Sequence, residues 1–127
     1  MVKEKNEIYK CSTCGNIVEI NHVGGGTLVC CGQDMNKQEP NTVEASTEKH
    51  LPIVEIIADK IIVKVGSIAH PMEETHFIEW VELIDEKNSC KKFLSPGMEP
   101  TVEFCKSEEI KKVRAYCNLH GLWETEI

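Results

Sequence analysis

The chain has 127 residues and a formal net charge of −7, and 41% of its residues are hydrophobic. This length suits one ordinary domain, or a small domain joined to a larger one, and the apolar content is enough for a core. The acidic balance argues against general binding of nucleic acid or of anionic membranes. The polar start, MVKEKNEIYK, lacks the apolar stretch of a signal peptide, and no run is long enough to span a membrane. We therefore expect a cytoplasmic protein.

Cysteine and histidine are the informative residue types in this sequence. There are seven cysteines and five histidines. In a reducing compartment, clustered cysteines are more often metal ligands or redox groups than disulfides, and the odd count argues against a fully paired framework. Four of the cysteines precede residue 32, whereas four of the histidines follow residue 49. This separation predicts two different metal sites.

The first cluster lies in residues 1–36, which we expect to form a small domain. Two cysteine corners, CSTCG and CCG, can hold one ion between them, with the adjacent pair distorting the tetrahedron. Four thiolates suit zinc or a mononuclear iron, and the spacing does not choose between these metals. A structural zinc site and a pair of disulfides are the alternatives. The four residues are Cys11, Cys14, Cys30 and Cys31.

The chain between the two corners is typical of a hairpin. Residues 17–20 alternate like a strand, three glycines at 24–26 make a turn, and residues 27–29 lead back. So small a segment cannot hold a core unaided, and a bound metal would supply the missing folding energy.

Residues 37–47 are polar and predict a linker, and residues 48–127 predict a second, larger domain. Short alternating segments separated by frequent turns favour an antiparallel β-sandwich, so the protein is expected to be mainly β. One helical turn is expected at 107–112, where the residues favour a helix. The expected strands are 53–57, 60–65, 76–84, 90–94, 101–105, 113–117 and 122–123.

The second cluster lies on loops and strand ends of this larger domain. Cysteine and histidine three residues apart can chelate one ion, and two further histidines share one loop. Four imidazoles and a thiolate are too many for a closed tetrahedral zinc site, and they suit iron with a sixth position open. The set is His50, His70, His76, Cys117 and His120.

The remaining cysteines and histidine fit no metal motif. Cys90 and Cys105 are expected to be small, partly buried residues, and His22 an ordinary histidine.

Five segments in order along the chain resemble one known family. They are YKCSTCGNIVE (9–19), LVCCGQDM (28–35), EKHLP (48–52), VGSIAHPMEETHFIEW (65–80) and YCNLHGLW (116–123). Together they span nearly the whole sequence and resemble the desulfoferrodoxins, a family of two-iron superoxide reductases.

This resemblance implies a fold and two iron ions per chain. The small domain would be a desulforedoxin-like iron domain, with Cys11, Cys14, Cys30 and Cys31 as ligands. The larger one would be an immunoglobulin-like β-sandwich with a catalytic iron. Its equatorial ligands would be His50, His70, His76 and His120, and its axial ligand Cys117.

The resemblance also implies an activity, one-electron reduction of superoxide to hydrogen peroxide in defence against oxidative stress. Lys49 would draw the anion toward the iron, and Glu48 would be the carboxylate that occupies the sixth position after oxidation. It further implies a small electron donor such as rubredoxin, and a homodimer. The alternatives are a pure electron-transfer module built on the cysteine iron, and a zinc-binding interaction domain.

Overall fold

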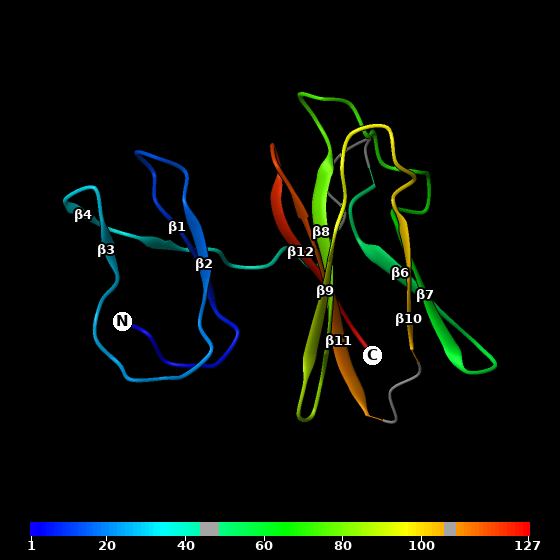
Figure 1. The fold of residues 1–127 in the computed structure, drawn as a ribbon, viewed down its shortest axis with the longest axis horizontal. Coiled ribbons are helices and arrows are strands. Elements are labelled where there is room, and N and C mark those ends of the chain that lie inside the picture. The colour runs from blue at the N-terminus through cyan, green and yellow to red at the C-terminus, as the bar shows by residue number, and fades with distance from the viewer. Residues whose placement is uncertain (44–48, 106–108) are drawn as a thin grey trace. The chain divides into compact units, whose positions relative to one another are not determined.

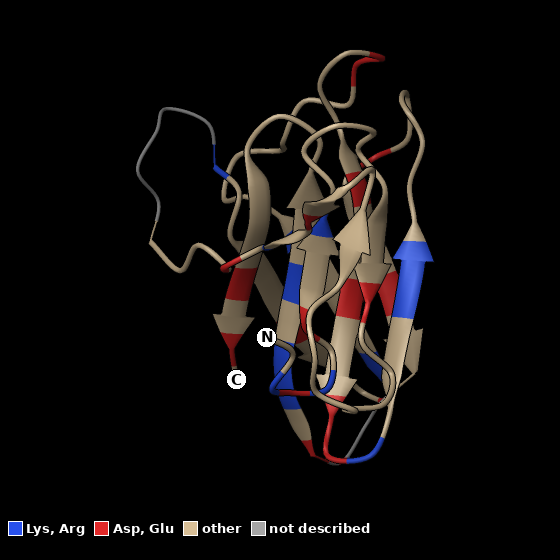
Figure 2. Cartoon of the chain, turned by 90° about the vertical axis from the view of Figure 1, so that its left-hand side faces the viewer, with Lys and Arg blue, Asp and Glu red and all other residues tan. Residues whose placement is uncertain are grey.

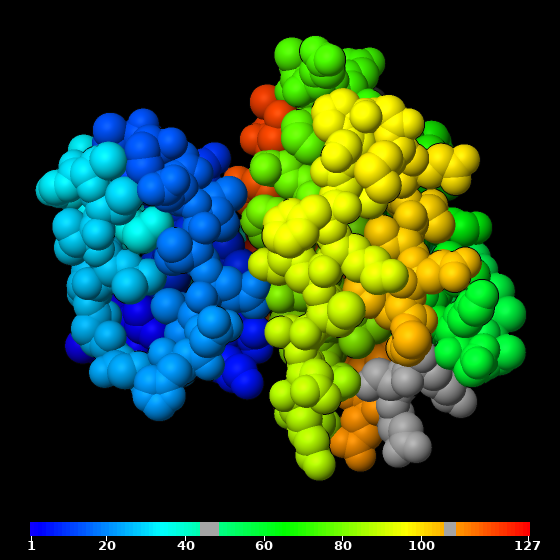
Figure 3. All heavy atoms as spheres, viewed as in Figure 1, coloured from blue at the N-terminus to red at the C-terminus, as the bar shows by residue number. Residues whose placement is uncertain are grey.

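A computed structural model describes residues 1–43, 49–105 and 109–127 (Figure 1). The chain divides into two compact units, Met1–Glu39 and Pro40–Ile127. Figure 3 shows the heavy atoms of both units as spheres. Within the described residues every regular element is a strand, and no helix could cross a membrane.

The first unit is built from very short strands. Its three-stranded sheet has the order β2-β1-β5, and β3 and β4 form a separate pair. The predicted pairing of residues 17–20 with residues 27–29 is wrong, because residues 17–19 pair with residues 8–10. The strands are β1 (Ile8–Lys10), β2 (Ile17–Glu19), β3 (Val29–Cys30), β4 (Gln33–Asp34) and β5 (Asn36–Lys37).

The cysteine corners themselves make the hairpin turns of this unit, which explains the different pairing. The amide of Cys11 donates a hydrogen bond to the Asn16 carbonyl at 2.9 Å, and the amide of Gly15 donates one to the Cys11 carbonyl at 2.9 Å. At the second corner, Cys31 and Gly32 both have positive φ, 54° and 74°. Successive left-handed residues suit a tight two-residue hairpin turn. Each corner therefore joins neighbouring strands, and the triple glycine is only a connection.

The interior of the first unit is small. Its buried hydrophobic cluster consists of Val2, Tyr9 and Ile20, with two partly buried side chains packed against it. Glu7 is buried beside this cluster, where it accepts a hydrogen bond from the Tyr9 hydroxyl at 3.0 Å and pairs with Lys37 at 3.1 Å. Lys37, expected in a linker, thus belongs to the sheet of the first unit through β5.

The second unit is an antiparallel β-sandwich of the immunoglobulin type. One sheet has the order β10-β7-β6 and the other β12-β11-β8-β9. All seven strands fall on segments predicted from alternation, with ends that differ by a few residues. They are β6 (Pro52–Ile57), β7 (Lys60–Val65), β8 (Ile78–Asp85), β9 (Ser89–Phe93), β10 (Thr101–Cys105), β11 (Ile110–Cys117) and β12 (Gly121–Glu126).

Alternate residues of both sheets form one core between them. Ile61 and Val63 from β7, Val81 from β8, and Val113 from β11 are fully buried there. The expected helical turn at 107–112 was wrong for residues 110–112, which begin β11; residues 107 and 108 lie outside the described residues. Pairing of Lys112 with Ile84 on β8 extends the sheet there, so sheet formation overrides the local helical preference.

The sheet that contains β8 is buried on its outer side as well. Glu82 and Arg114 are 1% and 4% exposed, and the Arg114 Nε donates to Glu82 at 2.9 Å. The Trp80 and Tyr116 rings stack beside this pair, with centroids 4.6 Å apart. A buried carboxylate needs such a partner, because unpaired burial of a charge is costly.

Cys90 and Cys105 are both exposed, so the expectation of partial burial was wrong. Both lie on strands at the edge of a sheet, β9 and β10. On β10 the alternation directs Phe104 inward and leaves Cys105 outward.

Candidate metal centres

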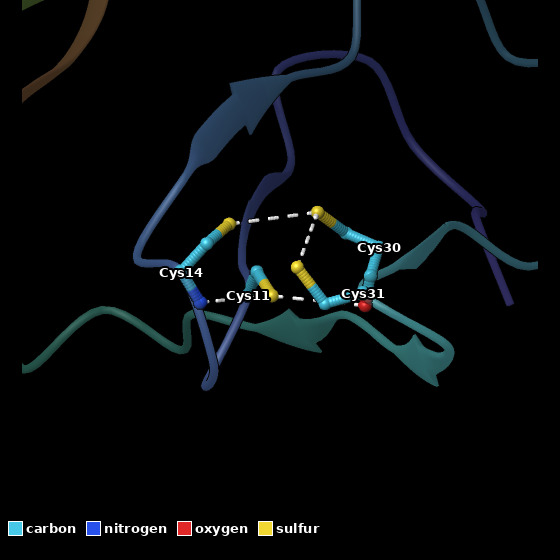
Figure 4. A group of neighbouring side chains, drawn as sticks. All are labelled: Cys11, Cys14, Cys30 and Cys31. Atoms are coloured by element: carbon cyan, nitrogen blue, oxygen red, sulfur yellow. Dashed lines mark hydrogen bonds between the residues drawn. The ribbon is translucent and has the colours of Figure 1, made fainter.

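The four cysteines of the first unit meet at its two hairpin turns. Figure 4 shows their side chains directed toward a common point from the two corners. The Cys14 and Cys30 sulfurs are 3.6 Å apart, and the Cys30 and Cys31 sulfurs are 3.9 Å apart. All four sulfurs lie within 4.8 Å of one another. A tetrahedral ion with metal–sulfur bonds of about 2.3 Å would place its thiolates roughly 3.8 Å apart, so the cluster fits one such ion.

Electrostatics in this cluster also favour a cation. Backbone amides, first that of Cys14 and then that of Thr13, hydrogen-bond the Cys11 sulfur and lower its pKa to about 6. Hydrogen bonds to the sulfurs of Cys14, Cys30 and Cys11 raise the pKa of Cys31 to about 12. One thiolate therefore forms readily while a neighbour resists ionisation, and a bound cation would offset the repulsion among four thiolates.

The second candidate site lies at one end of the sandwich. The start of β6, the end of β7, the start of β8 and the β11–β12 turn meet there (Figure 1). His50 precedes β6, His70 and His76 lie on the connection from β7 to β8, Cys117 ends β11, and His120 is in the turn before β12. These elements are distant in sequence, and the sandwich gathers them.

Four imidazoles form a closed ring at this end. The imidazole centroids of His50 and His70 are 4.6 Å apart, and those of His70 and His76 are 4.8 Å apart. His120 closes the ring of four, because its centroid lies 5.1 Å from that of His76 and 4.9 Å from that of His50. Each contact is edge-on, with interplanar angles between 61° and 83°. Such a ring can direct one nitrogen from each imidazole toward a common centre.

The Cys117 sulfur completes this donor set. It lies 3.8 Å from Nδ1 of His120, which is itself 3.2 Å from Nε2 of His50. Donor atoms of His50, His76, Cys117 and His120 all lie within 4.8 Å of one another, and His70 joins them through its ring contacts. A register shift between Tyr116 and Cys117 interrupts the pairing with β8. Bulges of this kind re-aim side chains next to functional sites.

Neighbouring groups fix the orientation of the imidazoles. Nδ1 of His70 is 2.7 Å from the Pro71 carbonyl, so it carries the hydrogen and leaves Nε2 to face a metal. The Trp123 ring stacks on His50 at 4.4 Å, and its Nε1 donates to the His120 carbonyl at 3.2 Å. Trp123 therefore supports two members of the ring.

Asn118 ties the β11–β12 turn to the segment that carries His76. Its Oδ1 accepts from the Phe77 amide at 2.9 Å, and its Nδ2 donates to the Thr75 carbonyl at 3.0 Å. Neither Asn118 nor Trp123 was predicted to have a role. Their place in the segment YCNLHGLW, on either side of His120, was the available signal.

The other residues singled out from the sequence are placed as follows. Lys49 is half-buried next to His50, and His22 is exposed in the first unit, outside both clusters. Glu48 lies outside the described residues. Figure 2 shows acidic and basic residues interspersed along the strands.

Comparison with known proteins identifies the family. The pattern of the desulfoferrodoxin family matches residues 42–126, and that of the desulfoferrodoxin N-terminal domain matches residues 3–38. The chain belongs to the desulfoferrodoxin family. A desulfoferrodoxin of Syntrophotalea carbinolica is 57% identical, over 97% of this chain and 98% of the relative. The two donor sets of this family member, four thiolates, and four imidazoles with one thiolate, fit two iron centres.

Further relatives agree with this family. A desulforedoxin of Megalodesulfovibrio gigas is 56% identical to the first unit, over 27% of this chain and 92% of the relative. The crystal structure of the superoxide reductase from Treponema pallidum superposes with a TM-score of 0.78 and 28% identity, covering 94% of this chain and 97% of that one.

Proposed function

We propose that this desulfoferrodoxin is a superoxide reductase, which joins one superoxide, one electron and two protons to give one hydrogen peroxide. The observation that carries this proposal is the closed ring of four imidazoles beside the Cys117 sulfur. Five donors around one ion leave a sixth position for a substrate. Proteins of the same fold, among them that of Treponema pallidum, are named superoxide reductases.

Each of the two side-chain clusters is proposed to bind one iron. Iron bound by the imidazoles and Cys117 would be the source of the electron that superoxide accepts. Cys117 supplies a negatively charged, electron-rich donor, which favours loss of an electron from the metal. Imidazole binds a metal as an uncharged donor, so four such ligands would leave the positive charge of the iron available to attract an anion. The ligands proposed here are His50, His70, His76, His120 and Cys117 for one site, and Cys11, Cys14, Cys30 and Cys31 for the other.

Lys49 is proposed to attract the substrate. Superoxide is an anion and the chain carries a net charge of −7, so a local positive charge beside the site is needed to speed the encounter. Lys49 adjoins His50 and is half-buried, which places its charge near the ligand in sequence and limits its screening by solvent. Glu48, from the same segment, is proposed as the carboxylate that closes the site after oxidation.

The remaining proposals concern domains, partners and location. The small iron domain, predicted from the sequence at residues 1–36, is proposed to extend through β5 to residue 39, and the following residues are proposed to lead into the catalytic sandwich. Exposed Cys14 and Cys31 support access of a small electron donor such as rubredoxin to the cysteine iron. A homodimer in the cytoplasm, serving electron transport and oxidative-stress defence, completes the proposal; it is supported by the family resemblance.

Metal analysis with visible spectra tests the proposal most directly. We expect two irons per chain, and separate absorption bands from the two sites that change when ascorbate reduces the protein. Pulse radiolysis with excess reductant should then give one hydrogen peroxide per superoxide consumed and no oxygen. A colourless zinc protein would favour the interaction-domain alternative, and two irons without superoxide consumption would favour pure electron transfer. Either outcome would contradict the proposed activity.

A further inference from the structure

Gly66 lies in a contact that no other residue type can make. It follows β7 directly, at φ +85°, and opens the loop that carries His70. A Cβ added to it would lie 2.3 Å from the Lys49 carbonyl oxygen and 2.6 Å from the Ile68 carbonyl oxygen. Both are backbone atoms, so no rotation of a side chain can relieve the overlap. The backbone itself would have to move.

This contact joins the two segments that hold neighbouring imidazoles. The Gly66 amide donates to the Leu51 carbonyl at 3.1 Å, so Gly66 touches the chain on both sides of His50. The amide of His70 donates to the Val65 carbonyl at 3.3 Å, which folds the second segment back onto the end of β7. The segment around His50 is thus held by Gly66, and His70 is held by the preceding residue, Val65.

The other glycines make no comparable approach. Six of them also have positive φ, which explains glycine at those turns. An added Cβ at any of the six would meet no heavy atom within 4 Å among the described residues. Gly97, at φ +90°, is an example in the same unit. Only at Gly66 does the missing side chain make room for another part of the backbone.

We propose that Gly66 is a positioning residue for the histidine site. Its bare Cα lets the Lys49–Leu51 backbone seat against the start of the 66–70 loop, and this contact sets the separation of His50 from His70 before a metal binds. The inference rests on the proposed roles of these histidines as ligands. Metal sites tolerate misplacement of only about 0.5 Å, so a forced shift of the Lys49 carbonyl would reach the site through His50.

The test compares Gly66→Ala with Gly97→Ala in the full chain. Both place alanine at nearly the same positive φ, so they share the backbone strain and differ in the overlap. The proposal expects Gly97→Ala to load two irons with wild-type spectra. Gly66→Ala should keep the cysteine-site iron and its colour, while the Fe²⁺ affinity of the histidine site falls at least tenfold. The midpoint potential of any iron held there should also differ. Equal affinity, spectrum and potential in the two variants would overturn the proposal.

A second measurement uses the wild-type chain, in case Gly66→Ala does not fold. In protein stripped of metal, the Gly66 amide should exchange its hydrogen slowly, because its bond to Leu51 precedes metal binding. Fast exchange at Gly66 beside slow exchange at core residues such as Val63 would overturn the inference. A wild-type protein that takes up no iron at its histidines contradicts the proposed function instead, so the two failures are distinguishable.

Discussion

The two candidate metal sites are supported in opposite ways. In the first unit the sulfurs lie on hairpin turns around a cluster of only three buried hydrophobic residues, and two of the four cysteines are exposed. In the sandwich, His50 and His70 are 1% and 2% exposed, and twelve buried residues form the adjoining core. Domains below about 40 residues usually need metals, disulfides or oligomerisation to fold. We therefore expect the first fold to depend on its ion, and the second to hold its ligands in place without one.

Removal of both metals should give the largest contrast between the units. We expect residues 1–39 to unfold while the sandwich stays folded, because structural metals contribute apparent free energies of about 10–16 kcal/mol to small domains. Amide NMR spectra of the stripped protein would show collapsed dispersion for the first unit and preserved dispersion for core residues such as Val63 and Val113. Re-addition of iron or zinc should restore the first set of signals. A first unit that keeps its dispersion without metal contradicts the comparison.

Replacing Cys117 with serine should abolish catalysis without affecting iron binding at the cysteine site. Cys117 is fully buried, and serine offers a poorer electron donor to the metal. We expect superoxide reduction to be lost while the cysteine-site iron stays, as measured by pulse radiolysis and iron per chain. Cys105→Ser is the matched control, because Cys105 is exposed and lies in neither cluster. Continued turnover by a Cys117→Ser protein with iron at its histidines would rule out the proposed role of Cys117.

A smaller effect is expected from Lys49→Gln. Loss of the local charge should slow second-order capture of superoxide by about tenfold at low salt and flatten its dependence on ionic strength. Lys60→Gln removes the same charge from an exposed strand residue that pairs with Glu103 at 3.6 Å, so it controls for net charge. Equal pulse-radiolysis rates for the two variants would show that the position of Lys49 does not matter.

The same contrast explains which features could be predicted from the sequence. Strands of five to eight residues in the sandwich show enough alternation to be located, and the ligand types appear in recognisable motifs. Strands of two or three residues in the first unit are too short to show a hydrophobic period, so the prediction of their pairing was wrong. The close approach at Gly66 depends on where a distant segment lies in space, which alternation does not encode.

The burial of Glu82 was not predictable for a similar reason. Its partner Arg114 is 32 residues away in the chain, and each residue taken alone suggests a solvated face. Only the pairing of β8 with β11, which sets Arg114 opposite Glu82, brings the two charges together.

The smallest expected effect concerns the stability of the first unit at acid pH. The Lys3 amide, with Lys37 and the Tyr9 hydroxyl, lowers the pKa of Glu7 from 4.5 to about 2. A carboxyl with a lowered pKa stabilises the fold above its unfolded pKa, and this contribution is lost as the pH falls from about 4.5 toward 2. Glu7→Gln should therefore lower the thermal midpoint of the metal-loaded first unit by a few degrees at pH 7. The difference from wild type should shrink below pH 4.5.

Glu39→Gln provides the control for this prediction, because Glu39 pairs with the same Lys37 at 3.3 Å but is 75% exposed. Exposed ion pairs contribute little to stability, so this variant should melt like the wild type across the pH range. Both variants must carry the same metal, since acid also protonates thiolates, and only the difference between them isolates the carboxyl. If the two melt alike at pH 7, then Glu7 does not stabilise the small unit.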